Sequence, residues 1–240
     1  MKLFLYRLYQ IFVMVPLMIV VTVPAALLTI AGCSLGGGRF WGYWPGHLWG
    51  RLMCWLSLVR VTVRGRENIS KGTSYVFVAN HQGAYDIFSI YGFLNHDFRW
   101  MMKSELRTIP LVGYACEKSR QIYVDKSSPR ALRHTMDRAE GLLGSGMSIV
   151  VFPEGARTWN GKMRAFKRGA FTLAQEFKLP VVPITIDGAF DIMPRFKKIP
   201  HWGHIKLTIH EPILPDAEKG HDLPALMAQS QAAIQSALPE

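Results

Sequence analysis

His81 and Asp86, five positions apart, carry the clearest chemical signal in the sequence. They lie in the segment N-H-Q-G-A-Y-D at 80–86, directly after an apolar, β-rich run. An imidazole titrates near neutral pH and can take the proton of a hydroxyl group. A carboxylate on the other ring nitrogen would fix the tautomer and stabilise the imidazolium, as in a catalytic triad. Taken alone, the pattern also fits a turn histidine ahead of a helix.

A second segment, F-P-E-G-A-R-T at 152–158, follows another apolar run. Gly155 lets the backbone approach a ligand closely, and Arg157 can hold a phosphate with paired donors. Glu154 can orient that arginine or accept a hydrogen bond from a ligand hydroxyl. Without further context, the segment also fits a tight turn with a surface arginine.

Two lysines come at or after the ends of predicted strands. Lys103 closes the strand expected over Phe98–Met102, and Lys126 ends the run I-Y-V-D-K at 122–126. Ligand sites in open α/β sheets lie beyond the carboxyl ends of the strands. Lys103 is therefore expected near the same sheet edge as His81, and the run ending in Lys126 is a predicted strand that ends in a second cation.

Together and in this order, these segments resemble the motifs of the glycerolipid acyltransferase family, most closely the lysophosphatidic acid acyltransferases. The resemblance covers about residues 61–190. It implies a catalytic pair and a group of acceptor-binding residues. These are His81 as base with Asp86 as its partner, and Lys103, Lys126, Glu154, Gly155 and Arg157 around the acceptor's phosphate.

The resemblance further implies an enzyme that moves a fatty-acyl group from acyl-CoA or acyl-carrier protein to the sn-2 hydroxyl of lysophosphatidic acid. The product would be phosphatidic acid for phospholipid biosynthesis, and neither a cofactor nor a metal is implied. Two positions depart from the family pattern. Lys126 replaces an arginine, which exchanges a bidentate fork for a point charge, and Ala156 replaces the usual threonine. The acceptor could therefore also be another lysolipid or glycerol-3-phosphate.

Other classes of protein are less consistent with the sequence. Gly32–Gly36 fits G-x-S-x-G, but it ends an apolar helix, whereas a nucleophile elbow needs a preceding strand. A non-catalytic lipid-binding protein would not need the His81/Asp86 pair. The chain shows no nucleic-acid-binding motif, so its basic character is assigned to lipid and phosphate partners.

From residue 61, short β-rich runs alternate with helical runs, which predicts one α/β domain over 61–240 with a central mixed sheet flanked by helices. The predicted strands are Val61–Arg64, Ser74–Ala79, Phe98–Met102, Gln121–Val124, Ser148–Phe152, Val181–Ile186 and Ile205–His210. The predicted helices are Ala84–Leu94, Ser128–Leu143, Lys167–Phe177 and Leu223–Ala237.

Residues 1–60 are predicted to form a hydrophobic helical pair that binds the membrane. The stretch Ile11–Ala31 has no charged residue and is long enough to span a bilayer as a helix. It could equally lie within one leaflet. The aromatic-rich segment Phe40–Leu58 fits either the headgroup boundary or packing against the domain.

The net charge of +11 favours anionic partners, here an anionic membrane and phosphorylated lipids. The three cysteines are far apart and form no metal-ligand or disulfide pattern, which is typical of a reducing compartment. We therefore expect a protein of the inner (cytoplasmic) membrane with its catalytic domain on the cytoplasmic side. The segment Phe190–Trp202, with its basic cluster, fits a membrane-contacting loop or a solvated turn.

Overall fold

A seven-stranded mixed sheet forms the centre of the computed structural model, which describes residues 2–125, 127–215 and 222–239. The strands are β1 (Val59–Arg64), β2 (Val76–Ala79), β3 (Phe98–Lys103), β4 (Ile122–Val124), β5 (Ser148–Val151), β6 (Val181–Asp187) and β7 (Gly203–Ile209). Their spatial order is β1-β7-β6-β2-β5-β3-β4. The five strands from β6 to β4 are parallel, β7 runs antiparallel to β6, and β1 is parallel to β7. The predicted mixed sheet is confirmed.

The alternation of side chains along the strands separates the two cores. On β2, Phe77 and Ala79 join one apolar cluster, whereas Val76 and Val78 join the cluster on the opposite face. All four side chains are fully buried, because this strand has neighbours on both edges and helices on both faces. The β2 ladder therefore holds a fixed register, and its carboxyl end lies at a defined place on the sheet edge.

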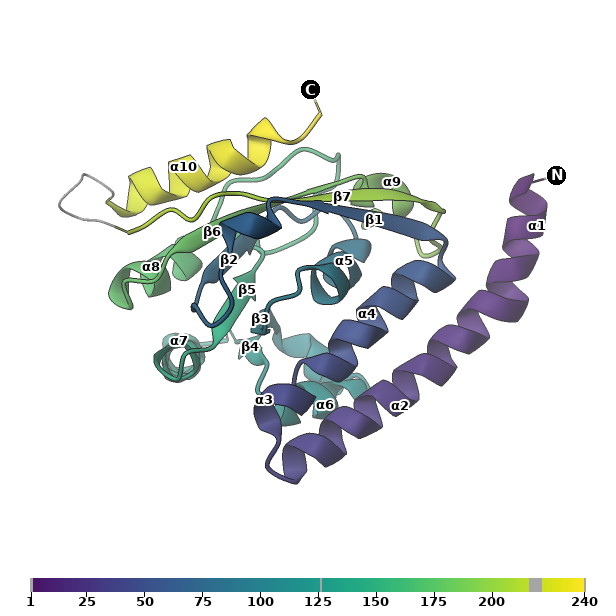
Figure 1. The fold of residues 1–240 in the computed structure, drawn as a ribbon, viewed down its shortest axis with the longest axis horizontal. Helices are drawn as coiled ribbons and strands as arrows, with labels where there is room; N and C mark the ends of the chain where they lie inside the picture. Colours follow the sequence, from purple (N-terminus) through teal and green to yellow (C-terminus); the bar gives the residue numbers. More distant parts are fainter. Residues whose placement is uncertain (1, 126, 216–221, 240) are drawn as a thin grey trace.

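Helices cover both faces of the sheet (Figure 1). One face carries α5 (Tyr85–Phe93) and α4 (Trp44–Leu56), while the other carries α7 (Pro129–Gly144), α8 (Gly169–Glu176) and α10 (Leu223–Ser236). Several shorter elements connect these helices and strands. They are α3 (Gly38–Trp41), α6 (Val112–Lys118), α9 (Ala189–Ile192) and the 3₁₀ turns Arg66–Asn68 and Ser104–Thr108.

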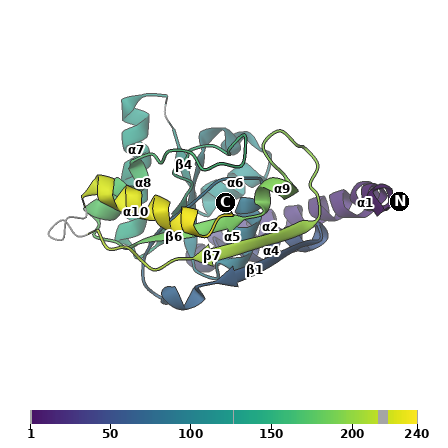
Figure 2. The same cartoon turned by 90° about the horizontal axis from the view of Figure 1, so that it is seen from above.

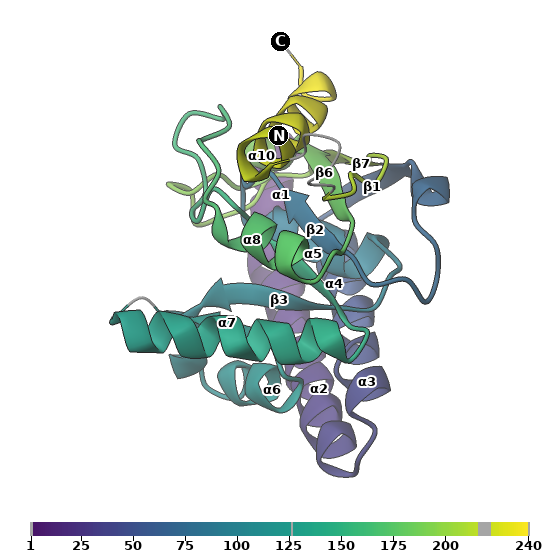
Figure 3. The ribbon, with the colours of Figure 1, turned by 90° about the vertical axis from the view of Figure 1, so that its left-hand side faces the viewer.

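The N-terminus forms one long helical run made of α1 (Lys2–Tyr9), a π-helical segment (Gln10–Met14) and α2 (Val15–Ser34). The segment Leu3–Ser34 is long and apolar enough to cross a membrane, and only 11% of its most apolar window is buried. Figure 2 shows α1 extending beyond the rest of the molecule, and Figure 3 shows α2 beside α3 and α6. The apolar side chains of this run therefore face outward, which fits membrane association.

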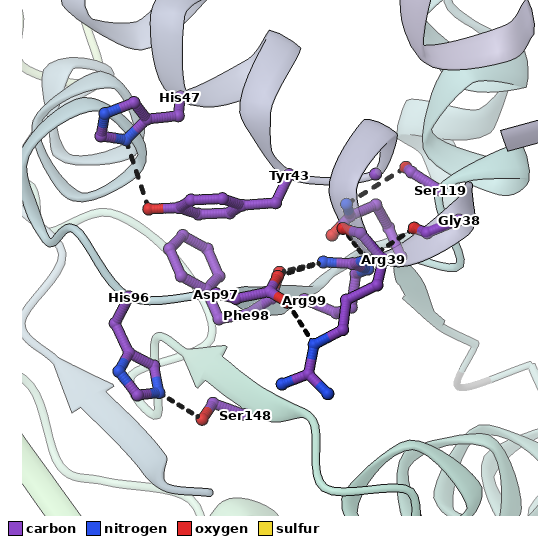
Figure 4. Close-up of polar contacts among 12 residues, drawn as sticks. Gly38, Arg39, Tyr43, His47, His96, Asp97, Phe98, Arg99, Ser119 and Ser148 are labelled. Carbon is purple, nitrogen blue, oxygen red and sulfur yellow. Dashed lines mark hydrogen bonds and ion pairs between the residues drawn. The ribbon is translucent and has the colours of Figure 1, made fainter. Parts of the chain in front are cut away.

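A buried arginine ties α3, which follows α2, to the sheet (Figure 4). Arg99 on β3 is 1% exposed, and its Nη2 donates to the carbonyl oxygens of Gly38 and Arg39 at 3.0 and 3.2 Å. Its Nη1 donates to Asp97 Oδ1 at 2.9 Å, and Arg39 Nε donates to the other oxygen of Asp97 at 3.0 Å. Asp97 thus compensates a buried positive charge that holds α3 against β3.

Asp97→Asn is therefore expected to lower the free energy of unfolding by about 3 kcal/mol, because it leaves the buried Arg99 guanidinium without its counter-charge. Urea unfolding of the purified chain in mild detergent would measure the change. Asp137→Asn is the matched control, since it breaks the exposed Arg133–Asp137 pair on α7, which contributes about 0.5 kcal/mol at most. Equal stability of both variants would contradict this account of Arg99.

His210, at the end of β7, links the sheet to α10. The Thr185 hydroxyl donates to the carbonyl oxygen of Ile234 at 2.8 Å, so its oxygen accepts from His210 Nε2, also at 2.8 Å. Burial lowers the pKa of His210 below its ordinary value of 6.5. The unfolded chain therefore binds the proton more readily than the folded one.

This difference predicts a pH dependence. As the pH falls through 6.5, the unfolded state takes up a proton at His210 before the folded state does, so the free energy of unfolding falls. His210→Gln removes that titrating group, so this variant should lose less stability between pH 7.5 and pH 5.5 than the wild type. Both pH values are about one unit from the ordinary histidine pKa. Urea titrations at the two pH values would test this, and parallel losses in both proteins would exclude His210 as a contributor.

Candidate active site

The chain leaves β2 through a buried asparagine that acts as one more residue of the sheet. The side chain of Asn80 donates to the carbonyl oxygen of Ile186 on β6 and accepts from the N–H of the same residue, both at 2.8 Å. Both polar ends of a 1% exposed amide are thus paired. This contact fixes the point at which the backbone turns away from the sheet, one residue before His81.

Asp86, in the first turn of α5, organises the loop that follows. Its Oδ2 accepts from His81 Nδ1 at 2.7 Å and from the backbone N–H groups of Gln82 and Gly83 at 2.6 and 2.9 Å. The Asp86 side chain is fully buried, and that of His81 is 14% exposed. Because the carboxylate accepts from Nδ1, the lone pair of neutral His81 lies on Nε2, where a substrate hydroxyl can be deprotonated.

The backbone of His81 is held from the loop after β5. Its N–H donates to Glu154 Oε1 at 2.7 Å, and its carbonyl oxygen accepts from the N–H of Thr158 at 2.9 Å. The other Glu154 oxygen accepts from the N–H of Arg164 at 2.8 Å. Glu154 is 2% exposed, and burial raises the pKa of its carboxyl group. Both oxygens of this predicted ligand residue therefore accept from backbone amides and join two loops.

The imidazole of His81 lies flat on an aromatic ring. The ring centroids of His81 and Phe152 are 4.0 Å apart, with an interplanar angle of 7°, and Phe152 in turn stacks on Trp100 at 5.4 Å. Stacking on one side and the carboxylate on one edge restrict the orientation of the imidazole. Phe152 was predicted only as part of a motif, because ring stacking between residues 71 positions apart leaves no local signal.

A cavity of about 1200 Å³ extends from His81 towards the N-terminal helices. Its walls include Thr22 and Ala26 of α2, Trp49 of α4, and Ile87 and Phe88 of α5. Among the described residues, four cationic side chains also line it, and they come from the end of β3, the connection between β5 and α8, and the loop between α9 and β7. They are Lys103, Arg157, Lys167 and Arg195. The cavity thus joins an apolar interior to a region of positive charge beside the histidine.

The predicted positive residues reach this cavity because β2, β5 and β3 are parallel neighbours. Lys103 ends β3, and Arg157 follows β5, so both lie at the same sheet edge as His81. Lys126 lies outside the described residues. Lys167 and Arg195 were not predicted as site residues, although Lys167 begins the predicted helix Lys167–Phe177 and Arg195 lies in the basic segment Phe190–Trp202.

Gly155 has a structural reason to be glycine. Its φ is +74°, in the left-handed region, and a Cβ atom at this position would lie 2.5 Å from Lys167 Nζ. Any larger residue would be strained and would displace the lysine from its place. The glycine therefore allows a cation to approach the backbone next to Glu154.

The parallel sheet edge, the buried His–Asp pair and the adjoining cavity define an α/β fold whose site has the geometry to activate a hydroxyl group beside an apolar pocket. A sequence model of the acyltransferase family matches residues 60–187. The chain therefore belongs to the acyltransferase family, and the resemblance found in the motifs is confirmed.

Several members of this family are similar to the chain. A chloroplastic 1-acyl-sn-glycerol-3-phosphate acyltransferase of Arabidopsis thaliana is 35% identical over 156 residues, which cover 64% of this chain and 44% of the relative. The alpha form of that enzyme in Homo sapiens is 32% identical, over 70% of this chain and 60% of the relative. The chain thus spans about half the length of the curated relatives it matches.

A solved structure covers nearly the whole chain. The crystal structure of the 1-acyl-sn-glycerophosphate (LPA) acyltransferase PlsC from Thermotoga maritima superimposes with a TM-score of 0.80 and 27% sequence identity. The match covers 97% of this chain and 93% of that chain, so it includes the N-terminal helices as well as the sheet.

Glu154→Gln should lower the free energy of unfolding by about 1–3 kcal/mol, because a glutamine offers one acceptor oxygen to two buried N–H donors. One of the amides of His81 and Arg164 would then face an NH₂ group. Urea unfolding would measure the loss, with the exposed Glu176→Gln on α8 as the matched control. If the two variants were equally stable, Glu154 would not hold the loops together.

Proposed function

We propose that this chain transfers a fatty-acyl group from the thioester of acyl-CoA or acyl-carrier protein to the sn-2 hydroxyl of lysophosphatidic acid, giving phosphatidic acid. The observation that carries the proposal is the 2.7 Å contact of His81 Nδ1 with a fully buried Asp86, at the wall of a cavity that is apolar in one part and cationic in another. The names of the Arabidopsis, human and Thermotoga relatives support this acceptor.

The reaction begins with the acceptor hydroxyl. His81 Nε2 takes its proton while the oxygen attacks the thioester carbonyl carbon, and Asp86 stabilises the imidazolium that forms. The tetrahedral adduct then collapses, the carbon–sulfur bond breaks, and the imidazolium returns the proton to the departing thiolate. The acyl group passes directly to the acceptor, so no acyl-enzyme is needed. Glu154 acts as a positioning residue through the N–H of His81.

The cationic side chains have a separate task in this scheme. Lys103 and Arg157 bind the phosphate of the acceptor, and Gly155 lets the backbone come close to it. We also assign Lys126 to this group from its place in the motif. Binding energy at the phosphate is thus converted into positioning of the hydroxyl at His81. The apolar walls contributed by α2, α4 and α5 take the acyl chains.

The proposed location follows from the helices and the cysteines. The outward-facing apolar run Leu3–Ser34 holds the chain at the membrane, and the positive surface favours an anionic leaflet. Cys33, Cys54 and Cys116 are all free thiols, which fits a reducing compartment. We therefore place the catalytic domain on the cytoplasmic side of the inner membrane, where it would meet acyl-CoA or acyl-carrier protein.

A test of the proposal is thiol release from acyl-CoA by the purified full chain in detergent, with and without lysophosphatidic acid. His81→Ala should lower turnover by about 10²- to 10⁴-fold, because the general base is lost. His134→Ala, which removes an exposed histidine on α7 outside the cavity, should keep wild-type turnover.

Each alternative gives a different result. Turnover with glycerol-3-phosphate or another lysolipid, but not with lysophosphatidic acid, would keep the chemistry and replace the acceptor. Absence of thiol release with every acceptor and with both donors would support a lipid-binding protein without catalysis. Near-normal turnover of His81→Ala would overturn the mechanism.

A further inference from the structure

A short loop beside the catalytic segment exposes apolar and basic side chains together. Residues 195–199, here called the 195–199 loop, read R-F-K-K-I and lie between α9 and β7. Phe196 and Ile199 are 56% and 52% exposed, and neighbouring Trp159 is 60% exposed. Lys197 and Lys198 are also exposed, and no acidic residue occurs in the loop.

The exposed side chains are held in place by contacts within this surface. The Arg195 guanidinium lies 4.4 Å from the centre of the Trp159 ring, and Phe196 meets Phe190 edge-on at 6.1 Å. The N–H of Lys197 donates to the carbonyl oxygen of Pro194, which closes a turn. The apolar groups therefore point outward from an ordered turn. Burying them in a partner would cost little conformational entropy, because the turn is already held in place.

The loop is also attached to the N-terminal helical run. Gln10 Nε2 donates to the carbonyl oxygen of Pro200 at 2.8 Å, and the Tyr6 ring contacts the Trp202 ring edge-on at 4.6 Å. On that run, the outward side chains of Phe4 and Phe12 are 66% and 73% exposed. The loop therefore continues the apolar surface of a helix that fits membrane association.

On its other side, the loop is attached to the catalytic segment. Gly83 forms a β-bridge with Pro194, and the N–H of Ala84 donates to the carbonyl oxygen of Met193 at 3.1 Å. Arg195, the first residue of the loop, lines the cavity that contains His81. Its position is thus coupled to both the membrane-facing helix and the site.

The chemistry of the loop favours one kind of partner. Positive charge alone would also suit an acidic protein, but Phe196 and Ile199 gain most from an environment that removes them from water beside anionic groups. The headgroup layer of a bilayer provides both, since it takes up apolar and aromatic side chains and attracts lysines through anionic lipids. Continuity with α1 gives the loop access to that layer.

We propose that the 195–199 loop is a second membrane contact of this chain, in addition to its N-terminal helices. Phe196 and Ile199 enter the headgroup layer, Lys197 and Lys198 bind anionic headgroups, and Arg195 is thereby held where the cavity meets the lipid surface. A lipid acceptor can then pass from the bilayer to His81 along a continuous positive and apolar path. The docking itself rests on the membrane association of α1 and α2, whereas the path for the acceptor rests on the proposed function.

Depth measurement tests the contact without any assay of activity. An environment-sensitive fluorophore is attached at Phe196→Cys, with the partly exposed Cys33 and Cys116 changed to alanine, and the full chain is placed in phosphatidylcholine–phosphatidylglycerol nanodiscs. We expect a blue shift and loss of fluorescence with brominated lipids at position 196. The same label at Lys71→Cys, before the amino-terminal end of β2, should show neither change. Equal responses at the two positions would overturn the proposal.

A charge-reversal pair tests its consequence for turnover. Lys197→Glu/Lys198→Glu should lower acyl transfer on phosphatidylcholine–phosphatidylglycerol vesicles by about fivefold or more. A fivefold loss corresponds to losing the attraction of about one lysine for an anionic surface. The same variant should match the wild type with substrate dispersed in detergent. Lys71→Glu/Lys178→Glu makes the same charge change near the opposite sheet edge and should leave both rates unchanged.

The outcomes separate the two proposals. A loop variant that matches its control on vesicles, or that loses as much turnover in detergent, would refute the coupling of this loop to the membrane. Absence of turnover in the wild type with every acceptor would refute the proposed function instead, and the fluorescence result would still decide whether the loop contacts lipid.

Discussion

The geometry of the site depends on a carboxylate that is completely removed from water. Placing an ionised Asp86 inside the protein costs several kcal/mol unless donors replace its hydration. Here one oxygen accepts hydrogen bonds from the ring Nδ1 of His81 and from the backbone N–H groups of Gln82 and Gly83. The first turn of α5 adds the positive end of a helix dipole. The chain from 81 to 83 must therefore curve around Asp86, and the orientation of the imidazole follows from that curve.

The second constraint is that the polar contacts around this loop reach both neighbours of β2, namely β6 and the loop that follows β5. Asn80 pairs with β6, whereas Glu154 brings the loop after β5 to the backbone of His81. Because β2 lies between these two strands, the histidine is fixed relative to both neighbours. The parallel arrangement also brings Lys103 and Arg157 to the same edge, so that positive charge lies on one side of His81.

The third feature is the position of the apolar helices relative to this edge. The cavity beside His81 takes part of its wall from α2, the same helix whose other side chains face outward. The buried Arg99, paired with Asp97, attaches α3, the element that follows that helix, to β3. An outward-facing apolar helix and the proposed catalytic pair thus share one framework, which suits the proposed acceptor, a molecule with a phosphate at one end and hydrocarbon at the other.

Local patterns in the sequence were enough to predict the strands and the contact between the two residues proposed to do the chemistry. All seven predicted strands are present within a few residues, because alternating β-branched and apolar residues bounded by glycine, proline and asparagine are local signals. The contact between His81 and Asp86 could also be predicted, because the two residues are only five positions apart. By contrast, α6 was not predicted, because Val112–Lys118 is short, contains a glycine and is preceded by Leu111 at a φ of +63°.

The contacts of the remaining residues could be learned only from the three-dimensional arrangement of the chain. Nothing in the local sequence marks Arg99 as a buried residue, yet it is buried, and its guanidinium donates hydrogen bonds to carbonyl groups about 60 positions away. Glu154 looks like a ligand for substrate, yet both its oxygens accept from backbone amides, one of them 73 positions away. The cavity likewise joins α2 to loops beyond residue 150. Such contacts depend on which chain segments the sheet order makes neighbours, and local spacing carries no information about that order.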